Sequence, residues 1–151
     1  MKDIDDISLN HFSFTVEDLD RTVSFFEQVF NFEILSKGPR DTAMIRAVTG
    51  LHDADIVVAF MKGPGFVIEF IEYVGQLRSR RMDMRPCDAS FAHLALNVPD
   101  LEQVQKRAER YGGRPLGKIG TVDTGPNKGK RLMYIQTWDG VTVEIMGGSP
   151  P

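Results

Sequence analysis

The sequence predicts an α+β protein made of two similar halves, and three observations support this prediction. First, the segment from His11 to Arg21 returns at His93 to Gln103, with His, Val, Asp and Leu repeated 82 residues later (93 − 11 = 82). Second, each copy leads into an apolar pattern of helical period. Third, each half closes with an apolar strand that carries one glutamate, Glu69 in Ile-Glu-Phe and Glu144 in Val-Glu-Ile. Each half is therefore predicted to run strand, helix and then several strands.

In the first half, residues 8–16 alternate between polar and apolar positions, which predicts a strand. Asp18 is placed to cap a helix, whose apolar stripe of Leu19, Val23, Phe26 and Phe30 should end near Asn31. Further strands are expected at residues 32–37, 43–48, 55–62 and 66–74, with turns at 38–41 and 63–65.

The second half repeats this order. A strand is expected at residues 90–98, and Asp100 with Gln103 forms a capping box for a helix that Gly112-Gly113 stops. Strands are expected at 114–119, 131–138 and 141–146, with a polar loop at 120–130, a tight Asp139-Gly140 turn and a frayed tail from 147. We expect one domain over residues 1–151, with modules at about 8–74 and 89–147 and a connector at 75–88.

The composition excludes several classes of protein. The chain has 151 residues, 42% of them hydrophobic, and contains no apolar run long enough to cross a membrane. A net charge of −3 argues against nucleic-acid binding. The acidic start does not resemble a signal peptide, and the single cysteine, Cys87, fits a reducing compartment. We therefore expect a cytoplasmic protein that binds neither membranes nor nucleic acid.

Strand alternation predicts one packed face and one open face in each half. In the second half Leu94 and Leu96 share one face, which leaves His93 and the neighbouring Ala95 and Asn97 on the other. The glutamates and the two repeated histidines should all lie on open faces, beside a partly apolar wall formed by Val67, Ile71, Ala95, Thr142 and Met146.

Two histidines and two glutamates in equivalent places indicate a metal site. A single His or Glu on a strand is more often an ordinary surface or hydrogen-bonded residue. However, two carboxylates brought together repel each other unless a cation lies between them. The repeat therefore favours His11, Glu69, His93 and Glu144 as metal ligands.

With these residues, the chain resembles the vicinal oxygen chelate superfamily, which includes glyoxalase I, methylmalonyl-CoA epimerase, extradiol dioxygenases and fosfomycin and bleomycin resistance proteins. The matching motifs are His-x-x-x-x-Val-x-Asp-Leu at His11 and His93, and Trp-Asp-Gly-Val-Thr-Val-Glu ending at Glu144, where the family usually has proline in place of Trp138. The resemblance implies two tandem βαβββ modules that form an eight-stranded, incompletely closed cup with its helices outside. It also implies one divalent metal per site and a homodimer.

The two-His, two-Glu set matches glyoxalase I, whereas the epimerases resemble it with Gln at the position of Glu69. A fourth protein ligand leaves about two positions of an octahedral ion open, enough for vicinal oxygens of a substrate. The implied reaction is proton transfer through a metal-stabilised enediolate, catalysed by a lyase or isomerase. The resemblance assigns Glu144 as principal base and Glu69 as ligand and second acid/base.

Two alternatives stay open. An iron(II) extradiol dioxygenase would use two His and one Glu, without Glu69. A binding or resistance protein of the same fold would sequester a ligand without turnover. The metal itself stays open among Zn, Ni, Co, Mn and Fe(II), because all accept His and carboxylate ligands.

The expected partner is a small-molecule substrate, and a glutathione or CoA thioester-type anion would suit the arginine-rich connector. The candidate substrate-binding residues lie on the open faces or in the connector; they are Ser13, Thr15, Asn97, Thr142, Met146, Arg78 and Arg81. The alternative for these arginines is a solvated linker. Whether one chain or two complete each site depends on the path of the connector.

Overall fold

The N-terminal half is a four-stranded sheet with two helices. The computed structural model describes residues 7–148. The chain runs β1 (Phe12–Thr15), α1 (Leu19–Phe30), β2 (Glu33–Pro39), α2 (Thr42–Thr49), β3 (Asp55–Gly63) and β4 (Phe66–Val74). The strand order is β1-β4-β3-β2, with β1 parallel to β4 and the other pairs antiparallel. β1 is therefore an edge strand, although it comes first in the chain.

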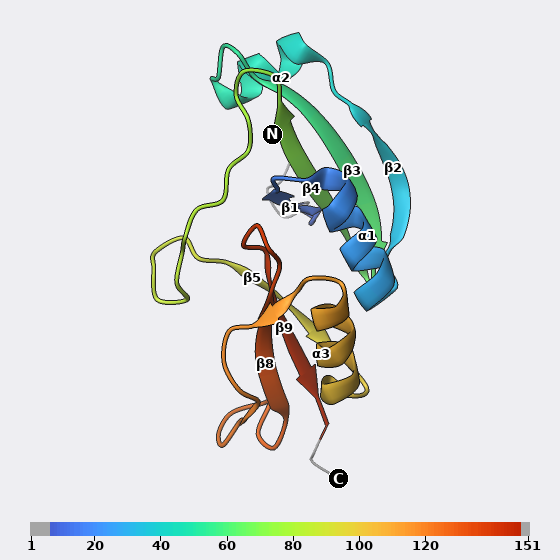
Figure 1. The fold of residues 1–151 in the computed structure, drawn as a ribbon, viewed down its shortest axis with the longest axis vertical. Coiled ribbons are helices and arrows are strands. Elements are labelled where there is room, and N and C mark those ends of the chain that lie inside the picture. The colour runs from blue at the N-terminus through green and yellow to red at the C-terminus, as the bar shows by residue number, and fades with distance from the viewer. Residues whose placement is uncertain (1–6, 149–151) are drawn as a thin grey trace.

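The C-terminal half repeats this topology in a sheet of its own (Figure 1). It contains β5 (His93–Asn97), α3 (Leu101–Arg110), β6 (Arg114–Pro115), β7 (Gly120–Thr121), β8 (Arg131–Gln136) and β9 (Thr142–Gly147). The order is β5-β9-β8-β6, with β7 also paired to β8 and β5 parallel to β9. The edge strand β5 thus corresponds to β1.

The predicted α+β fold of two similar modules is confirmed, and neither sheet closes into a barrel. The strand predicted at 43–48 is wrong, because these residues lie in α2. Asp41 caps this helix by accepting a hydrogen bond from the Met44 N–H at 2.7 Å, and Gly50 ends it with φ of +71°. The strand predicted at 114–119 shortens to β6, and the loop predicted at 120–130 begins with β7.

Smaller differences lie at the ends of elements. Residues 90–92 precede β5, and Gly147, predicted to fray, is the last residue of β9. The acidic start at residues 1–6 and the tail from 149 lie outside the described residues. No helix within residues 7–148 is long and apolar enough to span a membrane.

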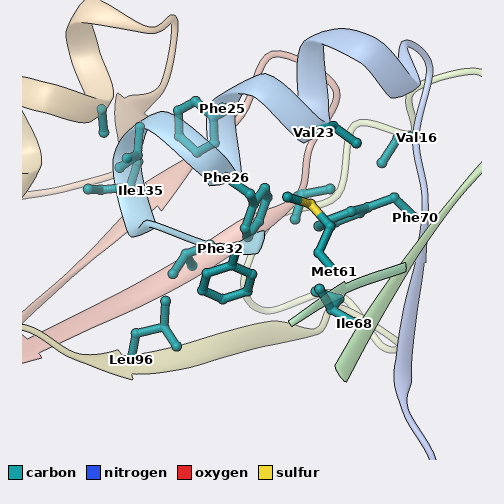
Figure 2. Packing of buried hydrophobic residues seen from close by; sticks show 14 of the residues in the cluster. Val16, Val23, Phe25, Phe26, Phe32, Met61, Ile68, Phe70, Leu96 and Ile135 are labelled. Carbon is teal, nitrogen blue, oxygen red and sulfur yellow. The ribbon is translucent and has the colours of Figure 1, made fainter. Parts of the chain in front are cut away.

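Helix α1 joins the two halves through a shared core (Figure 2). Its buried Phe26 packs against Phe70 of β4 with the rings tilted and their centroids 4.6 Å apart, and the Phe25 ring centroid lies 5.8 Å from that of Trp138, at the turn between β8 and β9. The same core includes Ile135 and other apolar residues of the second sheet. Burial of large aromatic side chains is the main source of stability here.

Polar contacts reinforce this junction. The buried Asp139, in the β8–β9 turn, accepts a hydrogen bond from the Glu17 N–H at 3.1 Å, just before α1. Glu17 in turn accepts one at 2.6 Å from the N–H of Arg81 in the connector. Figure 1 shows this connector as a long loop that leaves β4 and enters β5. The loop, α1 and the β8–β9 turn are therefore tied together.

Candidate metal centre

His11 and Glu69 form the first half of the candidate site. His11 lies directly before β1, and Glu69 lies on the adjacent β4, in register with Ser13. The His11 Nε2 is 3.3 Å from the Glu69 Oε2. The other ring nitrogen, Nδ1, is 2.6 Å from the Asn10 Oδ1. A proton on Nδ1 donated to Asn10 leaves the Nε2 lone pair free to bind a cation.

His93 and Glu144 form the second half in the same register. His93 is opposite Thr142 on β9, two residues before Glu144, and its Nε2 is 2.9 Å from the Glu144 Oε2. His11 lies one residue before Phe12, which pairs with Ile68 on β4. The position opposite His11 is therefore two residues before Glu69, as the position opposite His93 is two residues before Glu144. The sequence repeat is therefore also a repeat in geometry.

An aromatic ring supports each histidine. Phe60 is opposite Glu69, and its ring meets that of His11 edge-on at 5.3 Å. Tyr134 is opposite Glu144, and its ring lies 4.9 Å from that of His93. Burial, and then the negative charge of Glu144, raise the pKa of the Tyr134 phenol. Sequence analysis missed both rings, although their equivalent places opposite the two glutamates were a usable signal.

The two glutamates pair with histidine rather than with lysine or arginine in the described part of the chain. Their side chains are only 14% and 12% exposed, and within residues 7–148 neither Glu69 nor Glu144 forms an ion pair with Lys or Arg. A largely desolvated carboxylate costs free energy unless a cation compensates it. Each imidazole–carboxylate pair thus fits half of a divalent-metal site.

One chain does not bring the two pairs together. Within the described part of the chain, no group of three or more His, Cys, Asp or Glu side chains is placed to hold a metal ion. The pairs lie on separate sheets, each beside an edge strand, β1 or β5. A single chain therefore presents two equivalent half-sites.

The predicted substrate-binding residues fall into two groups. Ser13, Thr15 and Asn97 are exposed, and Met146 is half-buried, on the faces that carry the half-sites. Thr142 is fully buried: its hydroxyl donates to the Gly140 carbonyl and accepts from the Gln136 amide, both at 3.2 Å.

The connector arginines also differ from one another. Arg78 is exposed, whereas Arg81 donates to the Trp138 carbonyl at 2.9 Å and pairs with Asp83 at 3.1 Å. Arg81 therefore anchors the connector to the second sheet. Cys87 is exposed.

Arg40 is a further residue that sequence analysis did not single out. Its guanidinium lies over the ring of Phe60, 5.5 Å from the ring centroid, and Phe60 contacts His11. This cation–π contact places a positive charge near the first half-site. In the sequence Arg40 is indistinguishable from any arginine of a turn.

Comparison with known proteins agrees with this architecture. Residues 8–145 match the glyoxalase/bleomycin resistance protein/dioxygenase superfamily, and the chain belongs to this family. Its relatives include a 2-epi-5-epi-valiolone epimerase from an Actinomyces species, 30% identical over 93% of this chain and 79% of the relative. A lactoylglutathione lyase from Arabidopsis thaliana is 24% identical over 93% of this chain but only 44% of its own length. The chain thus spans less than half of that lyase.

Solved structures share the fold. A glyoxalase family protein from Bacillus cereus superposes with a TM-score of 0.81 at 20% identity, covering 99% of both chains. The fosfomycin resistance protein FosX from Listeria monocytogenes, solved with Mn(II) and sulfate, gives a TM-score of 0.63 at 17% identity, covering 94% of this chain and 93% of that one. At these identities the likeness shows the fold alone.

Proposed function

We propose that this protein is a divalent-metal-dependent isomerase or lyase of glyoxalase I or epimerase type, which transfers a proton through an enediolate. The observation that carries this proposal is the pair of equivalent His–Glu half-sites, whose carboxylates form no ion pair with Lys or Arg within residues 7–148. The epimerase relative supports it, because inversion at a carbon next to a carbonyl proceeds by removal and return of a proton. We favour an epimerase, working as one two-module domain in the cytoplasm.

The active site is proposed to form between two copies of the chain. The edge strands β1 and β5 each leave one side unpaired by the other strands of their sheet. If β1 of one copy lies beside β5 of the next, His11 and Glu69 face the partner's His93 and Glu144. Two-fold symmetry then gives two identical four-ligand sites per dimer. This arrangement also joins the strands β1-β4-β3-β2 of one copy to β5-β9-β8-β6 of the next, which gives the eight strands of the expected cup, with the short β7 added beside β8.

The four side chains would hold the metal through two imidazole nitrogens and two carboxylates. When bound, a divalent cation supplies positive charge that stabilises the enediolate as it forms. Glu144 removes the proton from the carbon next to the carbonyl, and Glu69 returns one on the other side. Because both carboxylates are largely buried, bulk water competes poorly for these protons.

Metal analysis tests this proposal. We expect about one divalent ion per chain in the wild type and its loss in both Glu69→Ala and His93→Ala. His52→Ala and Glu109→Ala, at exposed positions, are the matched controls and should keep the metal. A wild type without metal after reconstitution would contradict the proposal. Metal kept in Glu69→Ala but lost in His93→Ala would instead favour the three-ligand dioxygenase.

A further inference from the structure

A row of four side-chain positions crosses the second sheet from the half-site to an arginine. His93 pairs with Thr142, Thr142 with Gln136, and Gln136 with Arg114. Residues directly opposite each other on adjacent strands share one face of a sheet. Arg114 of β6 therefore lies on the same face as His93 and Glu144. With three strand-to-strand steps of about 4.8 Å, the backbone at Arg114 is about 14 Å from that at His93.

Gln136 fixes two arginines at the end of this row. Its side chain is buried, at 3% exposure. Its Oε1 accepts hydrogen bonds from the Arg114 Nη2 at 2.8 Å and the Arg81 Nη2 at 3.5 Å. Its Nε2 donates to the Thr142 hydroxyl at 3.2 Å and the Gly140 carbonyl at 3.4 Å. Since all these bonds hold the amide in one orientation, both guanidinium groups are held in place.

The charge around this amide is incompletely balanced. The two arginine nitrogens share one oxygen, so they lie within about 6 Å of each other and their charges repel. In the part of the chain that the structure describes, the one ion pair of Arg81 is with Asp83, whose side chain is almost fully exposed. Within residues 7–148, Arg114 forms no ion pair with a carboxylate. An anion bound between the two groups would remove this repulsion.

A cavity of about 420 Å³ opens beside these groups. The connector forms one wall with Arg81, Asp83 and Arg85, and the sheet forms the other with Arg114 and Gln136. Arg85 is paired with Asp88 at 2.9 Å, which leaves its contribution to the cavity nearly neutral. Asp83 and Asp88 balance two of the three arginines, Arg81 and Arg85. The remaining positive charge is that of Arg114.

We propose that this cavity binds a phosphate group on the substrate, held between the guanidinium groups of Arg81 and Arg114. Planar guanidinium groups bind phosphate oxygens through paired, charge-assisted hydrogen bonds. Resting on the function proposed above, this defines the substrate class as a phosphorylated carbon acid. Its phosphate sits on an arm long enough to reach across the sheet from the reacting carbon at Glu144.

Calorimetric titration of the protein with inorganic phosphate, carried out with and without added divalent metal, tests this inference. We expect saturable binding that weakens at least about tenfold in Arg114→Gln, because a charge-assisted hydrogen bond is lost. Arg114→Lys should recover part of it. Arg110→Gln, which removes the same charge from an exposed position at the end of α3, should leave binding unchanged.

The comparison with Glu144→Gln separates this inference from the proposed function. Phosphate that binds the arginine cavity should still bind Glu144→Gln, even if that variant or the wild type holds no metal. Binding lost in Glu144→Gln but kept in Arg114→Gln would place phosphate at the His–Glu centre and overturn the inference. Equal affinity in Arg114→Gln and wild type, or the absence of saturable binding, would overturn it as well.

Discussion

At the scale of the residue, the central group is Glu144. It lies 2.9 Å from His93, faces Tyr134 across the strand pair and is mostly shielded from water. Burial, and then the negative charge of Glu144, raise the pKa of Tyr134, so the phenol stays protonated and neutral at ordinary pH. In the proposed mechanism, this carboxylate accepts a proton from carbon when a bound divalent cation balances its charge.

Glu144→Gln should lower turnover of an accepted substrate by about 10²- to 10⁴-fold, because glutamine keeps the shape of the side chain but cannot accept the proton. The measurement is the rate at which the substrate C–H exchanges with deuterium from solvent, followed by NMR, with metal content determined on the same samples. Glu109→Gln on the exposed surface of α3 is the control. Full exchange in Glu144→Gln with the metal still bound would refute Glu144 as the base.

The repeat predicted His11, Glu69, His93 and Glu144 as the ligands of one metal ion, and this four-ligand set stays a prediction. Alternation placed His11 and His93 on open faces, and the structure brings each beside its glutamate at 3.3 and 2.9 Å. The roles of Gln136 and Arg114 could not be predicted in this way. They depend on the register of β6, a strand of two residues whose pairing no sequence period reveals.

At the scale of the element, α2 is the main departure from the predicted strands. The run from Ala43 to Val48 is short and apolar, and a run of this length does not distinguish strand from helix. The decisive signals were the cap at Asp41 and the stop at Gly50. The helix packs Ile45 on Ile56 and other buried residues of the N-terminal sheet.

Ile45→Ala should destabilise the protein by about 2–4 kcal/mol, since it removes buried methyl groups and leaves a cavity between α2 and the sheet. Ile45 is 8% exposed, whereas the neighbouring Met44 is 45% exposed. Met44→Ala should therefore cost much less and serves as the control. Chemical denaturation measures both. Equal losses of stability would mean that α2 does not pack through Ile45.

The turn between β8 and β9 is the element that ties the halves together. Asp139 accepts hydrogen bonds from the Glu17 N–H at 3.1 Å and from the Thr137 hydroxyl at 2.6 Å. Asp139→Ala removes the acceptor of both bonds, one part-buried and one buried, so the free energy of unfolding should fall by about 1–3 kcal/mol. Thermal unfolding measures this against Asp123→Ala in an exposed loop. A loss no greater than that of Asp123→Ala would contradict the structural role of Asp139.

At the scale of the whole molecule, α1 and the β8–β9 turn join the two sheets of one chain through a shared core. The two half-sites nevertheless remain separate. The repeat predicted the topology of each half but could not decide how the halves combine, because that depends on the path of the connector. The structure shows the connector bound to Glu17 and to Trp138 through Arg81. The four-ligand centre proposed above therefore requires a second copy of the chain.

Complementation between two inactive variants tests the shared centre most directly. One variant carries His11→Ala and Glu69→Ala, and the other His93→Ala and Glu144→Ala, so neither can form a complete site alone. After dissociation and re-association at equal concentrations, half of the dimers should be mixed, and each mixed dimer should have one intact site out of two. We predict that the mixture binds about a quarter of the metal of the wild type, while each variant alone binds none. A mixture that binds no more metal than the separate variants would show that the two halves of the site are not shared between chains.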